Sequence, residues 1–167
     1  MSRPLILTLK LDADSFAMLD GLRRRYFPAD RNVVPAHVTL FHALPGGEEE
    51  RLVRDLNREV SRHSAFDLSY PSLRFLGRGV AINVLGDGLL TLRQRLAELW
   101  RPCLGAQDRA GYRPHVTIQN KVAAGEARAL FASLSEGWRS FDGRAEGLLL
   151  WRYLGGPWGS VAEFVFR

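Results

Sequence analysis

The sequence predicts an α+β protein made of two similar lobes that face each other across a central cleft. Two observations predict this fold class. The order strand, helix, strand, helix, strand occurs twice along the 167 residues. The middle strand of each copy carries the same tripeptide, His37-Val38-Thr39 in the first and His115-Val116-Thr117 in the second. We therefore expect a pseudo-two-fold axis that places the two motif strands opposite each other.

Runs of branched, aliphatic and aromatic residues predict the strands, and apolar residues at three- to four-residue spacing predict the helices. Asp12 and Asp14 both offer N-cap oxygens for the first helix, and the arginines at 23–25 complement the dipole at its end. The expected strands cover residues 5–11, 36–44, 66–76, 80–85, 112–122, 147–154 and 160–166. The helices are marked by Phe16, Leu19, Leu22 and Tyr26, by Leu52, Val53, Leu56 and Val60, by Leu89, Leu92, Leu96 and Leu99, and by Ala127, Leu130, Phe131, Leu134 and Trp138. We expect one bilobal domain over residues 1–167, with approximate lobes at 1–78 and 79–167 that can exchange strands.

Composition and charge limit the class of protein. The chain is 46% hydrophobic and 25% charged, which is ordinary for a globular protein. Its net charge of +5 favours anionic partners such as nucleic acid, nucleotides or acidic lipid, although many arginine-rich proteins bind no specific anion. The single cysteine, Cys103, excludes an internal disulfide and a cysteine-based zinc site. No segment approaches the roughly 18 apolar residues of a membrane-spanning helix, so we expect a cytoplasmic protein. We also expect a monomer with no obligate protein partner.

The duplicated His-x-Thr tripeptide is the strongest functional feature, because the chain has only four histidines and four threonines. Residues two apart on a strand point to the same face. His37 and Thr39 therefore share one face, while Val38 and Leu40 point to the opposite one. The second copy repeats this arrangement, so each strand presents one imidazole and one hydroxyl group on an apolar backing.

Two such strands can hold a phosphate group between two imidazoles. Displacement at phosphorus requires a base for the entering oxygen and an acid for the departing one, on opposite sides of the phosphorus atom. Imidazole can serve in either role near neutral pH, and threonine hydroxyls can donate to the non-bridging oxygens. This chemistry requires no metal and no cofactor, and neither motif supplies the further ligand that a zinc site would need. We therefore expect His37, Thr39, His115 and Thr117 to be catalytic.

The two motifs, His37-Val38-Thr39-Leu40 and His115-Val116-Thr117-Ile118, lie about eighty residues apart in a basic chain. In this pattern the sequence resembles the two-histidine phosphoesterase superfamily, which includes 2′-5′ RNA ligase-like proteins and cyclic nucleotide phosphodiesterases. The resemblance implies a bilobal α+β fold with two antiparallel sheets lining a central cleft and helices on the outside. It also implies metal-independent chemistry on 2′,3′-cyclic phosphates, 2′-5′ linkages or related cyclic phosphates.

The residues after the second motif depart from the resemblance. Several relatives carry an arginine there, whereas this chain reads Gln119-Asn120-Lys121. By alternation Gln119 and Lys121 share the face of His115, so both are candidate substrate-binding residues and Lys121 can supply the missing charge. Arg113, just before the motif, is another candidate for this charge.

Aromatic residues near the motifs are further candidates for binding the substrate. Phe41 falls on the cleft face by alternation, where its ring either stacks on a base or packs against the wall of the cleft. Tyr112 precedes the second motif and is also expected to bind substrate. His42 is expected to point away from the cleft, and His63 to end a helix.

These residues predict a metal-independent phosphodiesterase that acts on RNA-type phosphate esters, with reversal as 2′-5′ RNA ligation. Its partners would be RNA ends or a small nucleotide substrate. The alternative is a non-catalytic RNA- or nucleotide-binding module on the same fold, in which Tyr112, Trp151 and Tyr153 stack on bases. A binding module has no use for both His-Thr pairs, which favours the enzyme.

Overall fold

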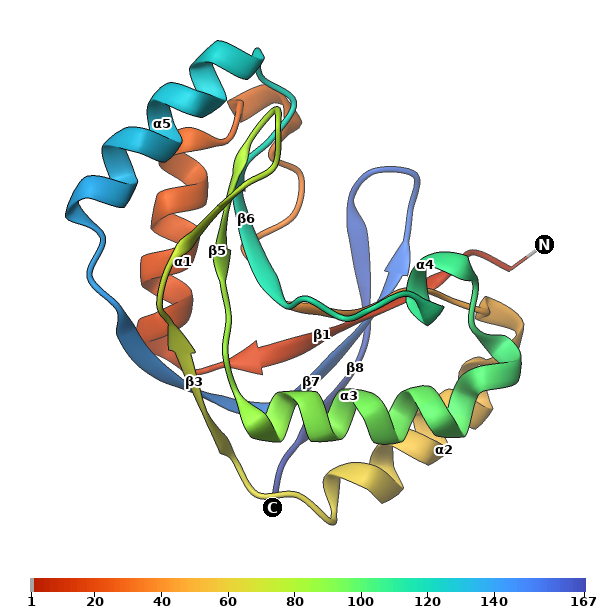
Figure 1. The fold of residues 1–167 in the computed structure, drawn as a ribbon. Helices are drawn as coiled ribbons and strands as arrows, with labels where there is room; N and C mark the ends of the chain where they lie inside the picture. The colour runs from red at the N-terminus through yellow and green to blue at the C-terminus, as the bar shows by residue number, and fades with distance from the viewer. Residues whose placement is uncertain (1) are drawn as a thin grey trace.

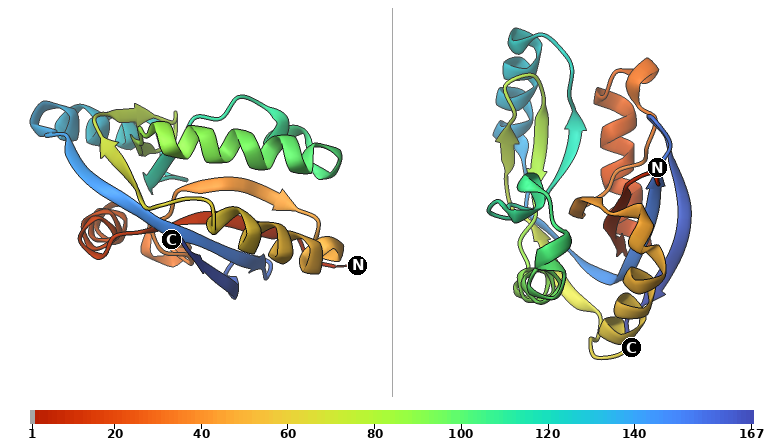
Figure 2. Two further views of the ribbon diagram at one scale, coloured as in Figure 1. Left: turned by 90° about the horizontal axis from the view of Figure 1, so that it is seen from below. Right: turned by 90° about the vertical axis from the view of Figure 1, so that its right-hand side faces the viewer.

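The computed structural model describes residues 2–167 as two antiparallel sheets with helices packed against them, which confirms the predicted α+β class (Figures 1 and 2). The larger sheet contains β1 (Leu5–Leu11), β2 (Thr39–Leu44), β3 (Phe66–Tyr70), β7 (Phe141–Tyr153) and β8 (Trp158–Val165). The smaller sheet contains β4 (Leu73–Phe75), β5 (Val80–Asn83) and β6 (His115–Gln119). The α-helices are α1 (Ala13–Tyr26), α2 (Glu49–Val60), α3 (Asp87–Trp100), α4 (Ala106–Arg109) and α5 (Ala124–Gly137), and 3₁₀ turns cover Ala29–Arg31, Gly46–Glu48 and Arg101–Cys103.

Strand β7 holds the larger sheet together. Its 13 residues pair with β1 along one edge and with β3 and then β8 along the other. β1 also pairs with β2, so the first strand of the chain lies inside the sheet, in the order β2-β1-β7. The strand that follows the first motif histidine is thereby attached, through β1, to a strand from the other end of the chain.

The smaller sheet is an insertion between two strands of the larger one. β3 and β7 pair with each other, and all of β4, β5 and β6 lie between them in the sequence. The left view of Figure 2 separates the smaller sheet, with α3 and α5, from the larger sheet, with α1 and α2. The predicted lobe boundary at residue 78 does not separate the two sheets. β4 of the smaller sheet lies before residue 78, and β7 and β8 of the larger sheet lie after it.

The strand predicted at residues 66–76 is two strands in different sheets. β3 ends at Tyr70, Pro71 and Ser72 follow, and β4 begins at Leu73. Proline has no N–H group to donate to a neighbouring strand. The interruption at Pro71 therefore suits a place where the chain leaves the larger sheet and enters the smaller one.

Both motif strands are shorter than the predicted ranges of 36–44 and 112–122, and both contain a β-bulge. In β2, Thr39 and Phe41 stand opposite adjacent residues of β1, so Leu40 is the extra residue. β6 has the same irregularity against β5, with Ile118 as its extra residue. A bulge shifts the alternation of side chains by one position. The regular alternation expected from the sequence therefore holds only up to the motif threonine of each strand.

Of the two predicted N-cap candidates, Asp12 caps α1, and Asp14 lies within its first turn. The Asp12 side chain accepts a hydrogen bond from the backbone N–H of Ser15 at 3.1 Å. It also accepts one from the backbone N–H of Arg144 at 2.8 Å. Because Arg144 lies in β7, this single carboxylate both begins the helix and ties it to the larger sheet.

The residues behind the motifs belong to one apolar core. Val38, Leu40, Val116 and Ile118 are fully buried in it, as predicted. α5 packs against β4 and β5, α2 against β8, and α1 against both β6 and β7. No helix within residues 2–167 is long and apolar enough to cross a membrane. Because α1 contacts strands of both sheets, it helps to fix their relative position.

Candidate active site

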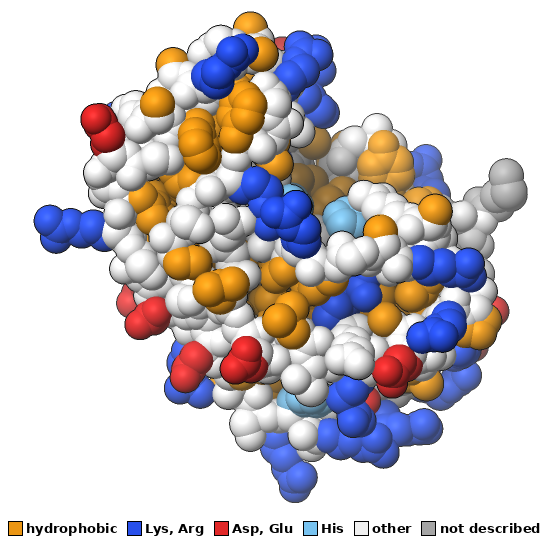
Figure 3. All heavy atoms as spheres, in the orientation of Figure 1, with side chains coloured by type: hydrophobic (Ala, Val, Ile, Leu, Met, Phe, Trp, Pro, Cys, Tyr) orange, Lys and Arg blue, Asp and Glu red, His pale blue; other side chains and the backbone are white. Residues whose placement is uncertain are grey.

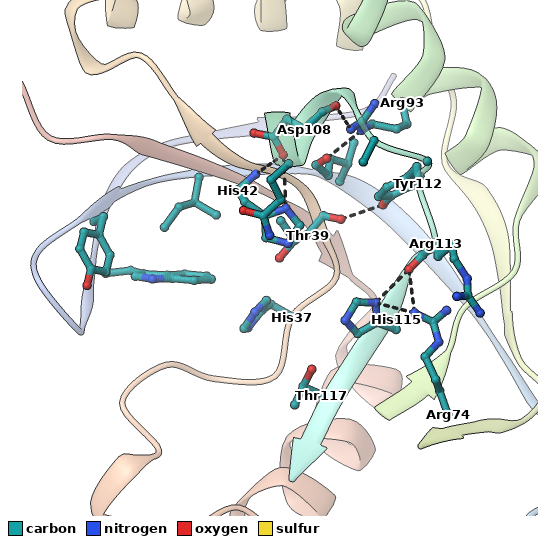
Figure 4. A pocket seen from close by; sticks show the side chains of 17 residues that line it. His37, Thr39, His42, Arg74, Arg93, Asp108, Tyr112, Arg113, His115 and Thr117 are labelled. Carbon is teal, nitrogen blue, oxygen red and sulfur yellow. Dashed lines mark hydrogen bonds and ion pairs between the residues drawn. The ribbon is translucent and has the colours of Figure 1, made fainter. Parts of the chain in front are cut away.

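The two motifs border one pocket of about 590 Å³, lined by residues of both sheets. Figure 3 shows it as a hollow with histidine side chains inside and basic side chains beside it. His37, Thr39, His115 and Thr117 all line the pocket, and Figure 4 shows them around one central space. The structure thus brings together the four residues that the sequence singled out, and their catalytic role stays a prediction.

His37 lies just before β2, and its imidazole is held on two sides. Nδ1 is 2.7 Å from the carbonyl oxygen of Pro35. Because a carbonyl oxygen can only accept, Nδ1 carries the proton in this hydrogen bond. The ring also packs against Trp158, with the ring centroids 4.6 Å apart. In the neutral ring, Nε2 is therefore the nitrogen that can take up a proton.

His115, the first residue of β6, repeats this arrangement. Its Nδ1 is 2.9 Å from the carbonyl oxygen of Arg113, again two residues earlier in the chain. The guanidinium of Arg74, on β4, lies beside the ring, with Nη1 3.3 Å from the same carbonyl oxygen and 3.3 Å from Nδ1. Both motif imidazoles are thus fixed through Nδ1 by the backbone that precedes them, and both keep Nε2 for acid–base chemistry.

Both imidazoles have a pKa below the ordinary value of 6.5. The pKa of His37 is lowered to about 4, mainly by burial, and the positive charge of Arg23 contributes to this decrease. Burial also lowers the pKa of His115, and the guanidinium of Arg74 adds to this effect. The backbone carbonyl that each ring contacts acts in the opposite direction. Both rings are therefore mainly neutral at pH 7, and an anion bound between them would favour protonation.

The backbone carbonyl groups of the two motif threonines are held by side chains from outside the motif strands. The hydroxyl of Tyr112, in the segment before β6, donates to the carbonyl oxygen of Thr39 at 2.8 Å. Nη1 of Arg23, in α1, donates to the carbonyl oxygen of Thr117 at 2.9 Å. Each bond joins an element next to one sheet to the motif strand of the other. Together they help to fix the motif strands relative to each other.

Arg23 does more than complement the dipole of α1, the role that the sequence favoured for it over an RNA-binding patch. Its residue surface is 4% exposed, and its Cζ lies 4.1 Å from the ring centroid of Phe27. Its Nε donates to Oδ1 of Asn32 at 2.8 Å. Burial lowers the pKa of Arg23 to about 10, which leaves the guanidinium charged at neutral pH. This buried cation therefore positions Thr117 and also acts on the charge of His37.

Of the five predicted substrate-binding residues, Tyr112 and Arg113 line the pocket and three do not. Phe41 is fully buried and packs against an aromatic ring of α3. Gln119 is buried as well, and Lys121 lies beyond the end of β6 with a positive φ of 64°. This placement corrects the prediction, because the bulge in each motif strand ends the alternation on which it rested.

Several residues line the pocket although the sequence did not predict it, among them His42, Arg74 and Trp158. His42 lines it instead of pointing away, again because of the bulge in β2. Arg74 and Trp158 reach it from strands that are remote in sequence from both motifs. Arg74 is held in place by Asn83, whose Oδ1 accepts from Nε at 2.9 Å. No local sequence pattern marks either residue, since only the sheet topology brings them to the site.

Of the three aromatic residues that would stack on bases in a binding module, two lie in the pocket. Tyr112 and Tyr153 line it, and 40% of the Tyr153 surface is exposed. Trp151 instead packs against Trp158 and donates from Nε1 to the hydroxyl of Thr8 at 2.9 Å. Tyr153 and Trp158 therefore offer aromatic surfaces to a ligand.

The polar groups of the pocket suit an anion. Asp108 is its one carboxylate, and its oxygens accept from the backbone N–H groups of His42 and Ala43 at 2.8 and 3.0 Å. Across the described residues, 2–167, no three or more His, Cys, Asp or Glu side chains are grouped so that they could hold a metal ion. The other polar side chains are imidazoles, hydroxyls, guanidiniums, the Gln107 amide and the Trp158 indole, which can all donate to phosphate oxygens.

A family model described as the 2′-5′ RNA ligase superfamily matches residues 11–157. The chain belongs to this superfamily. Membership confirms the resemblance to the two-histidine phosphoesterases and supports a phosphoesterase-type function. No curated protein sequence matches the chain.

Solved structures share the fold over the whole length of the chain. TT0787 from Thermus thermophilus matches with a TM-score of 0.71 and 17% identity, covering 98% of each chain. Escherichia coli LigT complexed with 3′-AMP matches with a TM-score of 0.66 and 15% identity, covering 100% of this chain and 99% of LigT. A structure described as a phosphoesterase matches with a TM-score of 0.64 and 16% identity, over 100% of this chain and 99% of its own.

Replacing Arg23 with methionine should destabilise the protein by about 2–4 kcal/mol, because two partly buried acceptors, Thr117 O and Asn32 Oδ1, lose their donor. It should also raise the pKa of His37, because a nearby positive charge is removed. Denaturant unfolding and NMR titration of the imidazole measure the two effects. Arg24→Met is the matched control: this side chain is 70% exposed, and we expect a change below about 0.5 kcal/mol. Equal losses of stability in the two variants would contradict the role given to Arg23.

Proposed function

We propose that this protein is a metal-independent phosphodiesterase that opens RNA-type phosphate esters, either 2′,3′-cyclic phosphates or 2′-5′ linkages. The observation that carries the proposal is the pair of imidazoles that share one pocket and are both anchored through Nδ1, at 2.7 and 2.9 Å. Anchoring of this kind fixes the tautomer and the orientation of each ring, and leaves Nε2 to exchange protons with a substrate. Membership of the 2′-5′ RNA ligase superfamily supports chemistry at phosphate esters.

The reaction needs one neutral and one protonated imidazole. The neutral ring accepts a proton from water through Nε2 while the water oxygen attacks phosphorus. The protonated ring donates its Nε2 proton to the ribose oxygen as the P–O bond to that oxygen breaks. The products are a phosphomonoester and a free neighbouring hydroxyl, and the two rings have exchanged protonation states. Attack by a 5′-hydroxyl in place of water gives a 2′-5′ linkage.

The phosphate itself is held by the groups between the two rings. The hydroxyls of Thr39 and Thr117 face the same space and can donate to the non-bridging oxygens as negative charge builds on them. Arg74 adds a positive charge on the side of His115. Because these groups are fixed before the substrate binds, little reorganisation is needed during the reaction.

The substrates that we propose are RNA ends or small nucleotides. LigT has been solved with 3′-AMP, phosphate, ATP and NADP+, all of which carry phosphate. In the present chain, Tyr153 and Trp158 line the pocket and can stack on a base. All groups of the proposed site come from one chain, so we further propose that a monomer is active without a protein partner.

Substitution of either motif histidine tests the proposal. His37→Gln and His115→Gln should each lower kcat/KM for a 2′,3′-cyclic nucleotide by about 10²- to 10⁴-fold, because each removes one proton-transfer group. Thr39→Val and Thr117→Val should lower it by about 10²-fold through loss of a phosphate donor. His63→Gln is the control, because His63 lies outside this pocket and contacts Glu59 at 2.9 Å. Activity that persists in either motif-histidine variant would overturn the proposal, and loss of activity with EDTA would indicate a metal-dependent mechanism instead.

The pH dependence provides a second test. Lowered pKa values mean that the protonated form of each ring is lost as pH rises through a value below 6.5. Because one ring must be protonated, kcat/KM should fall above pH 6.5, and because the other must be neutral, it should fall below about pH 4. We therefore expect a bell-shaped profile with its maximum on the acidic side of pH 6.5. Initial rates across this range measure the profile. A maximum above pH 7 would show that the lowered pKa values of the two imidazoles do not set the pH dependence of the reaction.

A further inference from the structure

A histidine–carboxylate pair lies in the pocket and has no part in the proposed chemistry. His42 lines the pocket, with 43% of its side chain exposed, and its Nδ1 is 3.3 Å from Oδ1 of Asp108. Figure 4 shows His42 next to Asp108 at the end of the pocket away from Thr117. The pair therefore lies beyond the space between the two motif histidines, where a second group of the substrate would be found.

Asp108 fixes the orientation of the His42 ring. It is 2% exposed, and it accepts from the backbone N–H groups of His42 and Ala43 as well as from the ring. Burial raises the pKa of this carboxyl group, but the hydrogen bonds from His42 and Ala43 outweigh it and hold the pKa below the ordinary value. Because a carboxylate can only accept, Nδ1 of His42 carries a proton, and Nε2 is left for a ligand.

Arg93 supports this pair from behind. Its residue surface is 7% exposed, and it donates to the carbonyl oxygens of Leu40 at 2.8 Å and of Asp108 at 2.7 Å. Its guanidinium lies over the rings of Phe41 and Tyr112 at 4.1 and 4.9 Å. These bonds hold the short α4 against β2, and the buried cation offsets the charge of the Asp108 carboxylate. His42 is thus a supported, pre-oriented group and differs from a mobile surface histidine.

We propose that His42 binds a second phosphate group of the substrate, so that the enzyme prefers nucleotides that carry a phosphate besides the one that reacts. This inference rests on the proposed function. With Nδ1 bonded to Asp108, the protonated ring donates from Nε2 to a phosphate oxygen. The pocket volume of about 590 Å³ lies within the usual range for sites that enclose a small organic ligand, so it has room for more than the reacting phosphate.

The direct test compares two substrates that differ only in the second phosphate: adenosine 2′,3′-cyclic phosphate with and without a 5′-phosphate. Wild-type protein should show a kcat/KM about tenfold higher for the 5′-phosphorylated compound, the effect of one charge-assisted hydrogen bond. In His42→Gln, which keeps a polar side chain but carries no charge, the ratio should fall to about one. The control is His63→Gln, which changes the His63–Glu59 pair outside the pocket. This variant should leave the ratio as in wild type.

A binding measurement separates this inference from the proposed function, because it needs no turnover. By calorimetry, adenosine 3′,5′-bisphosphate should bind wild-type protein about tenfold more tightly than 3′-AMP, and His42→Gln should abolish the difference. His42→Phe, which keeps a ring but has no N–H group, should do the same and serves if the glutamine variant does not fold.

The outcomes are distinct. Turnover of both cyclic phosphates with a wild-type ratio near one would overturn the inference and leave the proposed function standing. A preference for the bisphosphate without turnover of any cyclic phosphate would support the inference and overturn the proposed function. A His42 variant that has a normal thermal unfolding curve but an equally lowered kcat/KM for both substrates would also overturn the inference, since His42 would then act on the reacting phosphate.

Discussion

The site depends on two hydrogen bonds from side chains outside the motif strands to the backbone carbonyl groups of the motif threonines. Tyr112 holds the carbonyl group of Thr39, and Arg23 holds that of Thr117. Tyr112 lies in the segment before β6 and Arg23 in α1, which contacts strands of both sheets, so the two bonds help to fix the motif strands relative to each other. In-line transfer at phosphorus requires a base and an acid at a fixed separation on opposite sides of one atom. Contacts to the backbone therefore hold the motif strands in place and leave the side chains of the motif residues, which we propose to be catalytic, free to bind substrate.

The duplication provides two equivalent anchors in unequal surroundings. Each motif imidazole bonds through Nδ1 to the carbonyl oxygen two residues earlier, so the local backbone supplies the same tautomer twice. The neighbours differ, because His37 packs against the indole of Trp158 while His115 lies beside the guanidinium of Arg74. An acid–base pair needs two groups that can hold different protonation states at one pH. Identical anchoring with different neighbours is a simple way to obtain such a pair from a repeated unit.

The fold class could be predicted from the repeated order of strands and helices. The orientation of the motif side chains could be predicted because strand alternation holds as far as each motif threonine. Beyond it, a bulge shifts the alternation, which is why Phe41 is in the core and His42 is in the pocket, the reverse of the prediction. Gln119 is displaced in the same way on the second strand. A bulge depends on how a strand pairs with its neighbour, and the residues of one strand do not reveal this pairing. Arg74 and Trp158 were missed for a related reason, since their place in the site follows from the order of strands in the two sheets.

The central claim is that the two motifs form an acid–base site for RNA-type phosphate esters. Phosphorus NMR of the protein incubated with a panel of 2′,3′-cyclic nucleotides and 2′-5′ dinucleotides tests it most directly, because the spectrum identifies the bond that is broken. The account predicts conversion of at least one of these compounds, with a cyclic phosphate giving a phosphomonoester. If every compound stays unchanged while the protein binds single-stranded RNA with an affinity that falls as salt rises, the account is contradicted and the chain is a binding module on this fold.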